Sequence, residues 1–149
     1  MKKTIMILFV ACVLVSSVFA SFSFKSLGVE TGFGNRGGLF VSGDMEVADN
    51  LDVYARLGYA FAAFNVSAGI QYKVADIEVA NAKVPFRPGL QFDFNFGNGF
   101  IFEALATAGF YVEARPFTAF VRPGFGLRVV KGGGTGFDWG VETGVAYMF

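Results

Sequence analysis

Histidine is absent from this chain of 149 residues, and cysteine occurs once, as Cys12. Without imidazole the chain cannot build a histidine-based catalytic triad, and it lacks the usual base that activates a nucleophile. A lone cysteine excludes internal disulfides and metal sites made of several thiolates. Lys and Arg number 12, as do Asp and Glu, so no basic excess attracts nucleic acid. We therefore expect no enzymatic activity, no cofactor and no nucleic-acid partner.

Long apolar runs are also missing beyond the N-terminus, although 54% of the residues are hydrophobic. A membrane-spanning helix needs about 20 consecutive apolar residues. High hydrophobic content without such a run argues against helical spans and leaves open a membrane structure with a shorter repeat. The length suits a single domain.

The N-terminus has the pattern of a secretory signal peptide. Lys2 and Lys3 form a basic start, an apolar run covers 4–15, and small residues precede the expected cleavage after Ala20. We therefore predict a signal peptide at residues 1–20 and one domain at 21–149. Without the two lysines, ten basic residues face twelve acidic ones, a net charge of −2.

Two other interpretations of the N-terminus fit the sequence less well. An uncleaved membrane anchor fits poorly because the apolar run is short. The segment Phe9–Cys12 loosely resembles a lipoprotein cleavage box, but cleavage there leaves the apolar run that follows unexplained. We therefore assign Cys12 to the signal peptide.

The last thirteen residues show the clearest pattern in the chain. Odd positions from Phe137 to Phe149 are mostly large and apolar, whereas even positions such as Asp138, Glu142 and Gly144 are small or charged. Because successive side chains of a strand point to opposite faces, this alternation predicts a β-strand with one apolar and one polar face.

The same alternation recurs in seven earlier segments, so we predict eight strands. The earlier segments are 27–33, 39–47, 51–61, 64–72, 84–96, 100–112 and 117–129, with Gly-rich turn chemistry in several of the gaps. Residues 74–83 lose the phase, which we interpret as a longer turn or a bulged strand start. Pro88 and Pro123 fall on apolar faces, where we expect bends.

Side-chain volume indicates which face lies inside. Eight strands enclose an interior just wide enough for side chains to fill, and the apolar face carries too many large residues to fit there. The other face is rich in Gly, Ala and Ser, and only 16% of the chain is charged against about 25% in typical soluble proteins. We therefore predict an all-β, eight-stranded antiparallel up-and-down transmembrane β-barrel. A soluble, lipocalin-like ligand-binding barrel is the alternative.

Charged residues on the inner face are the candidate site. Buried charges must be paired and hydrogen-bonded, so we predict a lumen plugged by a network of arginines and carboxylates. Its candidate members are Arg56, Arg87, Arg122, Arg128, Lys73, Asp52, Asp93, Glu103, Asp138 and Glu142, with Asp44 and Glu46 also facing inward. A narrow, low-conductance ion path through the same charges is the alternative.

The turn positions predict which inner residues lie opposite one another. Each long guanidinium is expected to face a glycine, in the pairs Arg56–Gly69, Arg87–Gly109 and Arg122–Gly144. Asp52–Lys73 and Arg128–Asp138 are expected to be direct charge pairs. Asp93 and Glu103 are expected to be opposed, and two such carboxylates can share a proton. This acidic pair is the one enzymatic alternative, although an ordinary lumen pair explains it more simply.

The end of the chain resembles a known family, the small eight-stranded outer-membrane proteins of the OmpA and OmpX type. The resemblance rests on Glu142, Gly144, Tyr147 and Phe149, which are similar to the family's C-terminal assembly signal. It implies export to the bacterial outer membrane, contact with outer-membrane lipid, reading by the barrel-assembly machinery and a monomer with both termini in the periplasm. The outside loops are then short, unlike those of the family's adhesins, which favours a structural role. A periplasmic partner of segment 74–83 stays open.

Overall fold

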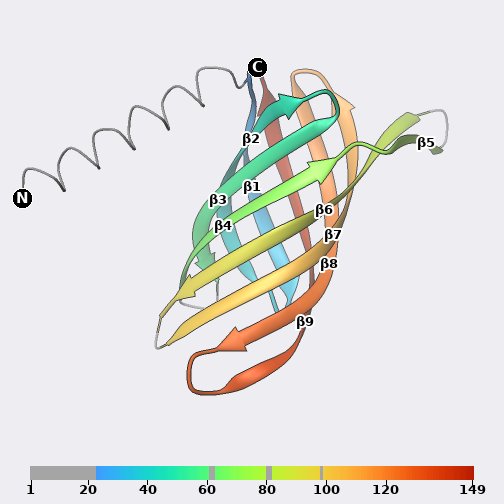
Figure 1. Ribbon diagram of the computed structural model, residues 1–149. Helices are drawn as coiled ribbons and strands as arrows, with labels where there is room; N and C mark the ends of the chain where they lie inside the picture. Colours follow the sequence, from blue (N-terminus) through green and yellow to red (C-terminus); the bar gives the residue numbers. More distant parts are fainter. Residues whose placement is uncertain (1–22, 61–62, 80–81, 98) are drawn as a thin grey trace, which may run out of the picture.

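The computed structural model describes residues 23–60, 63–79, 82–97 and 99–149. The predicted signal peptide, residues 1–20, lies outside this part of the chain. Every regular element described is a β-strand (Figure 1), which confirms the all-β prediction. The strands are β1 (Ser23–Gly34), β2 (Gly38–Ala48), β3 (Leu51–Ala60), β4 (Ala63–Tyr72), β5 (Ala75–Val79), β6 (Ala82–Phe96), β7 (Phe100–Ala114), β8 (Phe117–Val130) and β9 (Gly134–Met148).

Eight of these strands close into one antiparallel barrel. The order of hydrogen-bonded neighbours is β4-β3-β2-β1-β9-β8-β7-β6, and β4 pairs with β6 to complete the circle. Strands that follow one another around the wall also follow one another in the chain, apart from the insertion of β5, so the up-and-down topology is confirmed. Closure gives both edges of each barrel strand a partner. Over the described residues, no helix has the length and apolar character needed to cross a membrane.

The two ends of the barrel carry different features. The terminal end holds Ser23, Phe149 and the β2–β3 and β7–β8 turns, while the far end holds the turns at 35–37 and 131–133. At the far end β8 and β9 pair as far as Val130 and Gly134, whereas β1 follows β9 only to Gly140. The β8–β9 hairpin therefore extends past β1, while β7 follows β8 to Val130 (Figure 1).

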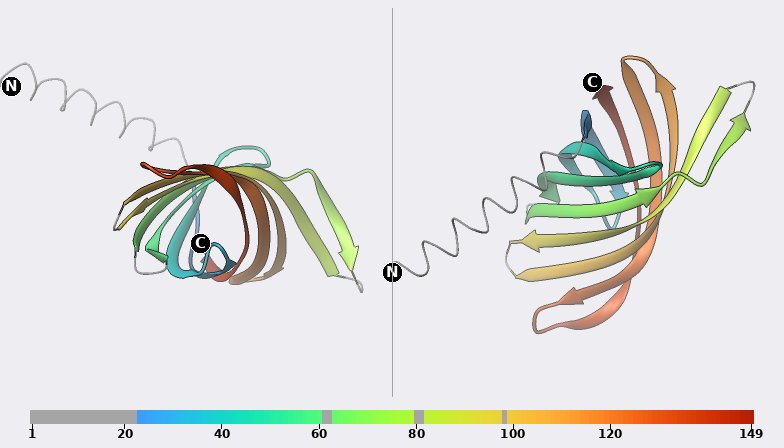
Figure 2. Two further views of the ribbon diagram at one scale, coloured as in Figure 1. Left: turned by 90° about the horizontal axis from the view of Figure 1, so that it is seen from below. Right: turned by 45° about the horizontal axis from the view of Figure 1, so that its top comes forward.

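Residues 75–79 and 82–86 pair as the two arms of a hairpin, so the prediction of a longer turn or a bulged strand start in segment 74–83 was wrong. Strand β5 pairs with the start of β6 from Ala75↔Phe86 to Val79↔Ala82, and β4 pairs with β6 only from Gly89 onward. Pro88 lies where the partner of β6 changes, and it has no N–H to donate to β4. On the N-terminal side of Pro88, the β5–β6 hairpin projects away from the barrel wall (Figure 2).

Pro123 interrupts the sheet more locally. The β7–β8 pairing is present at Thr107↔Gly124 and again at Phe110↔Val121, with no pairs recorded between them and no shift of register. On its other side Pro123 still pairs with Val141 of β9. The proline therefore costs β8 part of one ladder without breaking the barrel.

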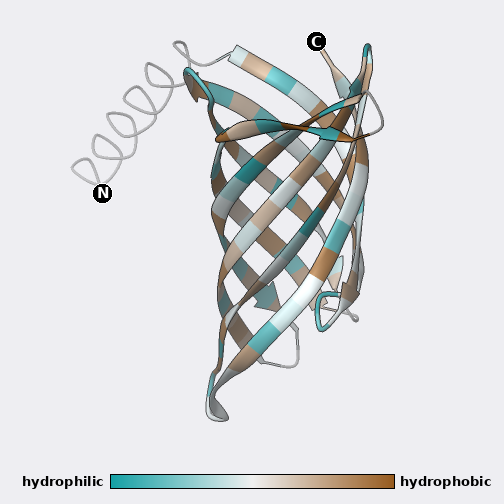
Figure 3. Cartoon of the chain, turned by 90° about the vertical axis from the view of Figure 1, so that its right-hand side faces the viewer, coloured by the Kyte–Doolittle hydropathy of each residue, from teal (hydrophilic) through white to brown (hydrophobic). Residues whose placement is uncertain are grey.

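The outer and inner faces are inverted relative to a water-soluble protein. Among the described residues, thirty large hydrophobic side chains are exposed, while the buried hydrophobic ones number six. Buried polar or charged residues outnumber them and include four arginines. Hydropathy alternates along the strands that form the barrel wall (Figure 3). The barrel thus has an apolar exterior and a polar interior, with the faces that the alternation predicted.

Candidate functional site

Six charged side chains meet in the middle of the barrel, and we call them the central layer. They are Arg36, Arg56, Arg122, Glu30, Asp93 and Glu142, none more than 3% exposed. Five of them come from five different strands, β1, β3, β6, β8 and β9, and Arg36 comes from the β1–β2 turn. Three positive and three negative groups give the layer no net formal charge.

Ion pairs link all six groups. Arg122 donates from Nε to Glu142 and from Nη2 to Glu30, each at 2.9 Å. Arg56 donates from Nη2 to Asp93 at 2.9 Å and also pairs with Glu30 and Glu142.

Arg36 completes the layer from the far end of the barrel. Its Nη2 pairs with both Asp93 and Glu142. Glu142 consequently contacts all three arginines, and it is the group on which the charge balance of the layer most depends.

Aromatic and amide side chains support the layer. Cζ of Arg122 lies 4.2 Å from the ring centroid of Tyr54, and Cζ of Arg56 lies 4.3 Å from that of Phe40. The Tyr54 hydroxyl donates to Gln91 at 2.7 Å, and the Gln91 amide donates to Asp93 and Glu142. Aromatic faces attract guanidinium groups, so the layer is held by stacking as well as by hydrogen bonds.

Glycines make the room that these large side chains need. A Cβ added to Gly69 lies 2.2 Å from Cζ of Tyr54, and one added to Gly144 lies 2.8 Å from the Phe120 ring. A Cβ on Gly140 lies 2.7 Å from Cγ of Arg36. Such distances are far inside van der Waals contact, so the bare inner face at these positions lets the ring and guanidinium groups cross the narrow interior.

A second group of charges, the terminal cluster, lies toward the terminal end. It consists of Lys25, Asp52, Arg87 and Glu113: Lys25 pairs with Asp52 at 2.9 Å, and Arg87 pairs with Asp52 and, at 3.3 Å, with Glu113. The Lys25 and Glu113 side chains are 29% and 37% exposed, respectively. The terminal cluster is therefore more exposed to water than the central layer.

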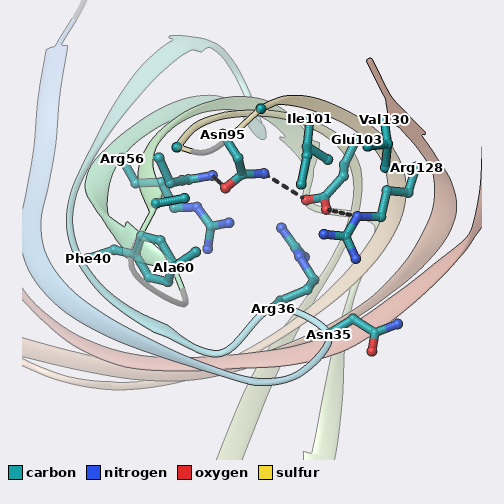
Figure 4. A pocket seen from close by; sticks show the side chains of 14 residues that line it. Asn35, Arg36, Phe40, Arg56, Ala60, Asn95, Ile101, Glu103, Arg128 and Val130 are labelled. Carbon is teal, nitrogen blue, oxygen red and sulfur yellow. Dashed lines mark hydrogen bonds and ion pairs between the residues drawn. The ribbon is translucent and has the colours of Figure 1, made fainter. Parts of the chain in front are cut away.

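The far end opens into a cavity of about 350 Å³. Arg36, Arg56, Arg128, Glu103 and Asn95 are among its lining residues (Figure 4). Glu103 accepts from Asn95 and pairs with Nε of Arg128, both at 3.3 Å. A cavity of about 410 Å³ at the terminal end shares none of these lining residues, and the central layer lies between the two.

The predicted pairings are partly correct. Arg87 lies opposite Gly109, and Asp93 lies opposite Glu103, as predicted. Arg56 lies opposite Ser67 instead of Gly69, and Arg122 lies opposite Glu142 instead of Gly144, so both of these predictions were wrong by two residues. The glycines face aromatic residues instead, in the pairs Tyr54↔Gly69 and Phe120↔Gly144.

The two predicted charge pairs are also wrong. Asp52 lies opposite Gln71, and Lys73 pairs with Asp76 at 2.9 Å outside the lumen. Arg128 lies opposite Gly136 and pairs with Glu103 of β7. Asp138 is fully buried opposite Gly126, and neither carboxylate oxygen has a hydrogen-bond partner among the described residues.

Arg36, Glu30 and Gln91 are members or supports of the central layer that the sequence did not identify. Strand alternation places Glu30 and Gln91 on the inner face, but nothing in the pattern distinguishes them from other inward polar residues. Arg36 belongs to a turn, where alternation gives no side-chain direction. Its signal is the glycine pair Gly124 and Gly140, which leaves the inner wall bare beneath it.

The arrangement is one of mutual neutralisation. Central-layer carboxylates are occupied by guanidinium groups, and the described residues contain no group of three or more side chains placed to hold a metal ion. Comparisons with protein-family models, with curated proteins and with solved structures found no match to this chain.

Proposed function

We propose that this protein is a small barrel of the bacterial outer membrane with a structural role, and that the central layer closes its lumen. The observation that carries the proposal is the inverted distribution of residues, with thirty large hydrophobic side chains exposed outside and the charges buried inside. Water gives such an exterior no stabilisation, whereas a bilayer removes it from water.

Dimensions and aromatic residues support a membrane location. The eight barrel strands are 10 to 15 residues long, and a tilted transmembrane strand needs about 9–11. Aromatic pairs gather at both ends of the outer face: Phe24–Phe149 and Phe117–Tyr147 at the terminal end, Tyr59–Phe64 and Phe96–Phe100 at the far end. Two aromatic girdles of this kind mark the two interfaces of a bilayer.

The resemblance to barrels of the OmpA and OmpX type adds the route to the membrane. Tyr147 and Phe149 are exposed on the outer face, and Glu142 and Gly144 face the interior. The aromatic residues of this C-terminal signal are thus accessible to a barrel-assembly machinery, while Glu142 serves the central layer of the folded protein. We infer an outer-membrane monomer that is in contact with lipid.

A closed lumen is favoured over an ion path because the middle of the barrel is filled. Arg56 and Arg122 are among the largest fully buried side chains, and Tyr54 and Phe40 pack on them. The two cavities at the barrel ends have no lining residue in common. The polar interior also differs from the apolar cavity expected of a lipocalin-like ligand carrier.

Flotation of the purified protein with vesicles tests the membrane proposal. Refolded protein is expected to rise with the lipid, to remain there after extraction with alkaline carbonate, and to migrate in its folded form on unheated SDS gels. A folded protein that stays soluble and sediments away from lipid contradicts the proposal.

A further inference from the structure

The β5–β6 hairpin is the described part of the sheet that lies outside the closed wall. Strand β5 pairs with β6 alone, and all five of its residues are exposed. In the view along the barrel, the hairpin continues away from the wall instead of following its curvature (Figure 2). It lies at the terminal end of the barrel, which also carries the aromatic pairs Phe24–Phe149 and Phe117–Tyr147.

Register divides the hairpin into two chemically different faces. The cross-strand pairs Ala75↔Phe86, Ile77↔Val84 and Val79↔Ala82 are apolar throughout. The alternate pairs Asp76↔Pro85 and Glu78↔Lys83 place three charged residues on the opposite face. The hairpin is therefore a small amphipathic sheet.

The apolar face continues the outer surface of the barrel. Within β6, Val84 and Phe86 have the same parity as the outward residues Leu90 and Phe92, which are 52% and 41% exposed. When a strand leaves the wall and bends outward, its outer face turns toward the surrounding bilayer surface. The charged face then turns away from the bilayer, toward water.

The open edge of β5 limits the depth. Its unpaired N–H and C=O groups cannot enter hydrocarbon without a cost of several kcal/mol each. Moving the charged side chains of Asp76, Glu78 and Lys83 into hydrocarbon also costs free energy. The apolar face, with Ile77 40% and Val79 55% exposed, is equally unsuited to water alone. The interfacial layer satisfies both requirements, as it does for amphipathic helices that lie on membranes.

Resting on the proposed membrane location, we propose that the β5–β6 hairpin lies on the bilayer beside the barrel, with the face formed by Ala75, Ile77, Val79, Ala82, Val84 and Phe86 against the lipid interface. The hairpin thereby enlarges the membrane footprint of the barrel on the leaflet at its terminal end. A second copy of the chain, paired through the β5 edge, is the competing occupant.

Tryptophan quenching by brominated lipid tests the orientation. Trp139 is the one tryptophan of the chain and lies on the outer face at the far end. In a Trp139→Phe background, Ile77→Trp probes the apolar face and Glu78→Trp, one residue away, is the matched probe of the charged face. In brominated vesicles we expect Ile77→Trp to show blue-shifted emission and to lose most of its fluorescence, and Glu78→Trp to show neither change. Val79→Trp repeats the apolar probe if Ile77→Trp does not fold.

Three results overturn the proposal, and wild-type Trp139 separates them. Equal quenching at 77 and 78, or none at either, while wild-type Trp139 is quenched, removes the hairpin from the interface but leaves the barrel in the membrane. A blue shift at 77 without quenching assigns the face to a second copy. Unquenched Trp139 in folded wild-type protein removes the membrane location and the hairpin proposal with it.

Discussion

The central layer and the terminal cluster use the same chemistry in different surroundings. Both are arginine–carboxylate networks inside the barrel, and both are balanced in formal charge. Every member of the central layer is at most 3% exposed, whereas Lys25 and Glu113 of the terminal cluster are 29% and 37% exposed. Removing one partner of a buried ion pair leaves the other charge buried and unpaired, whereas at an exposed pair water takes the partner's place. The same substitution should therefore have large effects in one place and small effects in the other.

Glu142→Ala should have the largest effect, because Glu142 contacts all three arginines of the central layer. We expect the free energy of unfolding to fall by about 3–5 kcal/mol, the range measured when one partner of a buried pair is removed. Urea titration of the protein refolded in micelles, followed by Trp139 fluorescence, measures the loss. Glu142→Gln keeps the size of the side chain and should retain most of the destabilisation; a loss of less than about 1 kcal/mol in both variants contradicts a sealed central layer.

Gly69→Ala should come next, because the added Cβ overlaps the Tyr54 ring that supports Arg122. Overpacking of this kind costs about 1–3 kcal/mol. Gly136→Ala is the matched control in a strand, since no heavy atom of the described residues lies within 4 Å of its added Cβ. Equal urea midpoints for the two variants would mean that the close Tyr54–Gly69 contact does not contribute to the stability of the barrel.

A charge-balanced double variant tests whether balance, more than any one pair, stabilises the central layer. Arg122→Met with Glu30→Gln leaves Arg36 and Arg56 with Asp93 and Glu142, which still contact one another. We expect the double variant to lose less stability than the sum of the single variants, with a coupling of about 1–3 kcal/mol in urea titrations. Strict additivity of the two single losses rules out this role of charge balance.

Glu113→Ala should have the smallest effect. The Glu113 side chain is 37% exposed and pairs with Arg87 at 3.3 Å, and Arg87 keeps Asp52 as a second partner. Exposed pairs contribute about 0–1 kcal/mol, so the urea midpoint should barely move. A loss comparable with that of Glu142→Ala removes the distinction between the two clusters.

The sequence predicts the wall of this barrel better than its contents. Alternation gave the eight strands and their two faces, because every strand places a full apolar set outward. Alternation could not reveal that the predicted partner of Arg56 was wrong, since a register shift of two residues keeps each side chain on its own face. The turn after Ala60 has no Gly or Asn to fix its centre, and the Gly132–Gly134 run offers several centres. By contrast, the Gly97-Asn98-Gly99 turn fixed the correct pairs Arg87–Gly109 and Asp93–Glu103.

Two other features depend on information outside strand alternation. Arg36 enters the central layer from a turn, where no periodicity gives the direction of a side chain. Strand β5 places its apolar residues at odd positions, out of phase with β4, and Pro88 lies where β6 changes its partner from β5 to β4. In both cases the tertiary surroundings, bare glycine walls for Arg36 and the change of partner for β6, decide the outcome.

Single-channel recording in planar bilayers tests the central claim, a membrane barrel closed by its central layer, most directly. Wild-type protein inserted from micelles should be silent, Arg122→Ala should conduct because it empties the middle of the lumen, and Arg87→Ala in the terminal cluster should stay near silence. A large, steady wild-type conductance that Arg122→Ala leaves unchanged contradicts a lumen closed by the central layer.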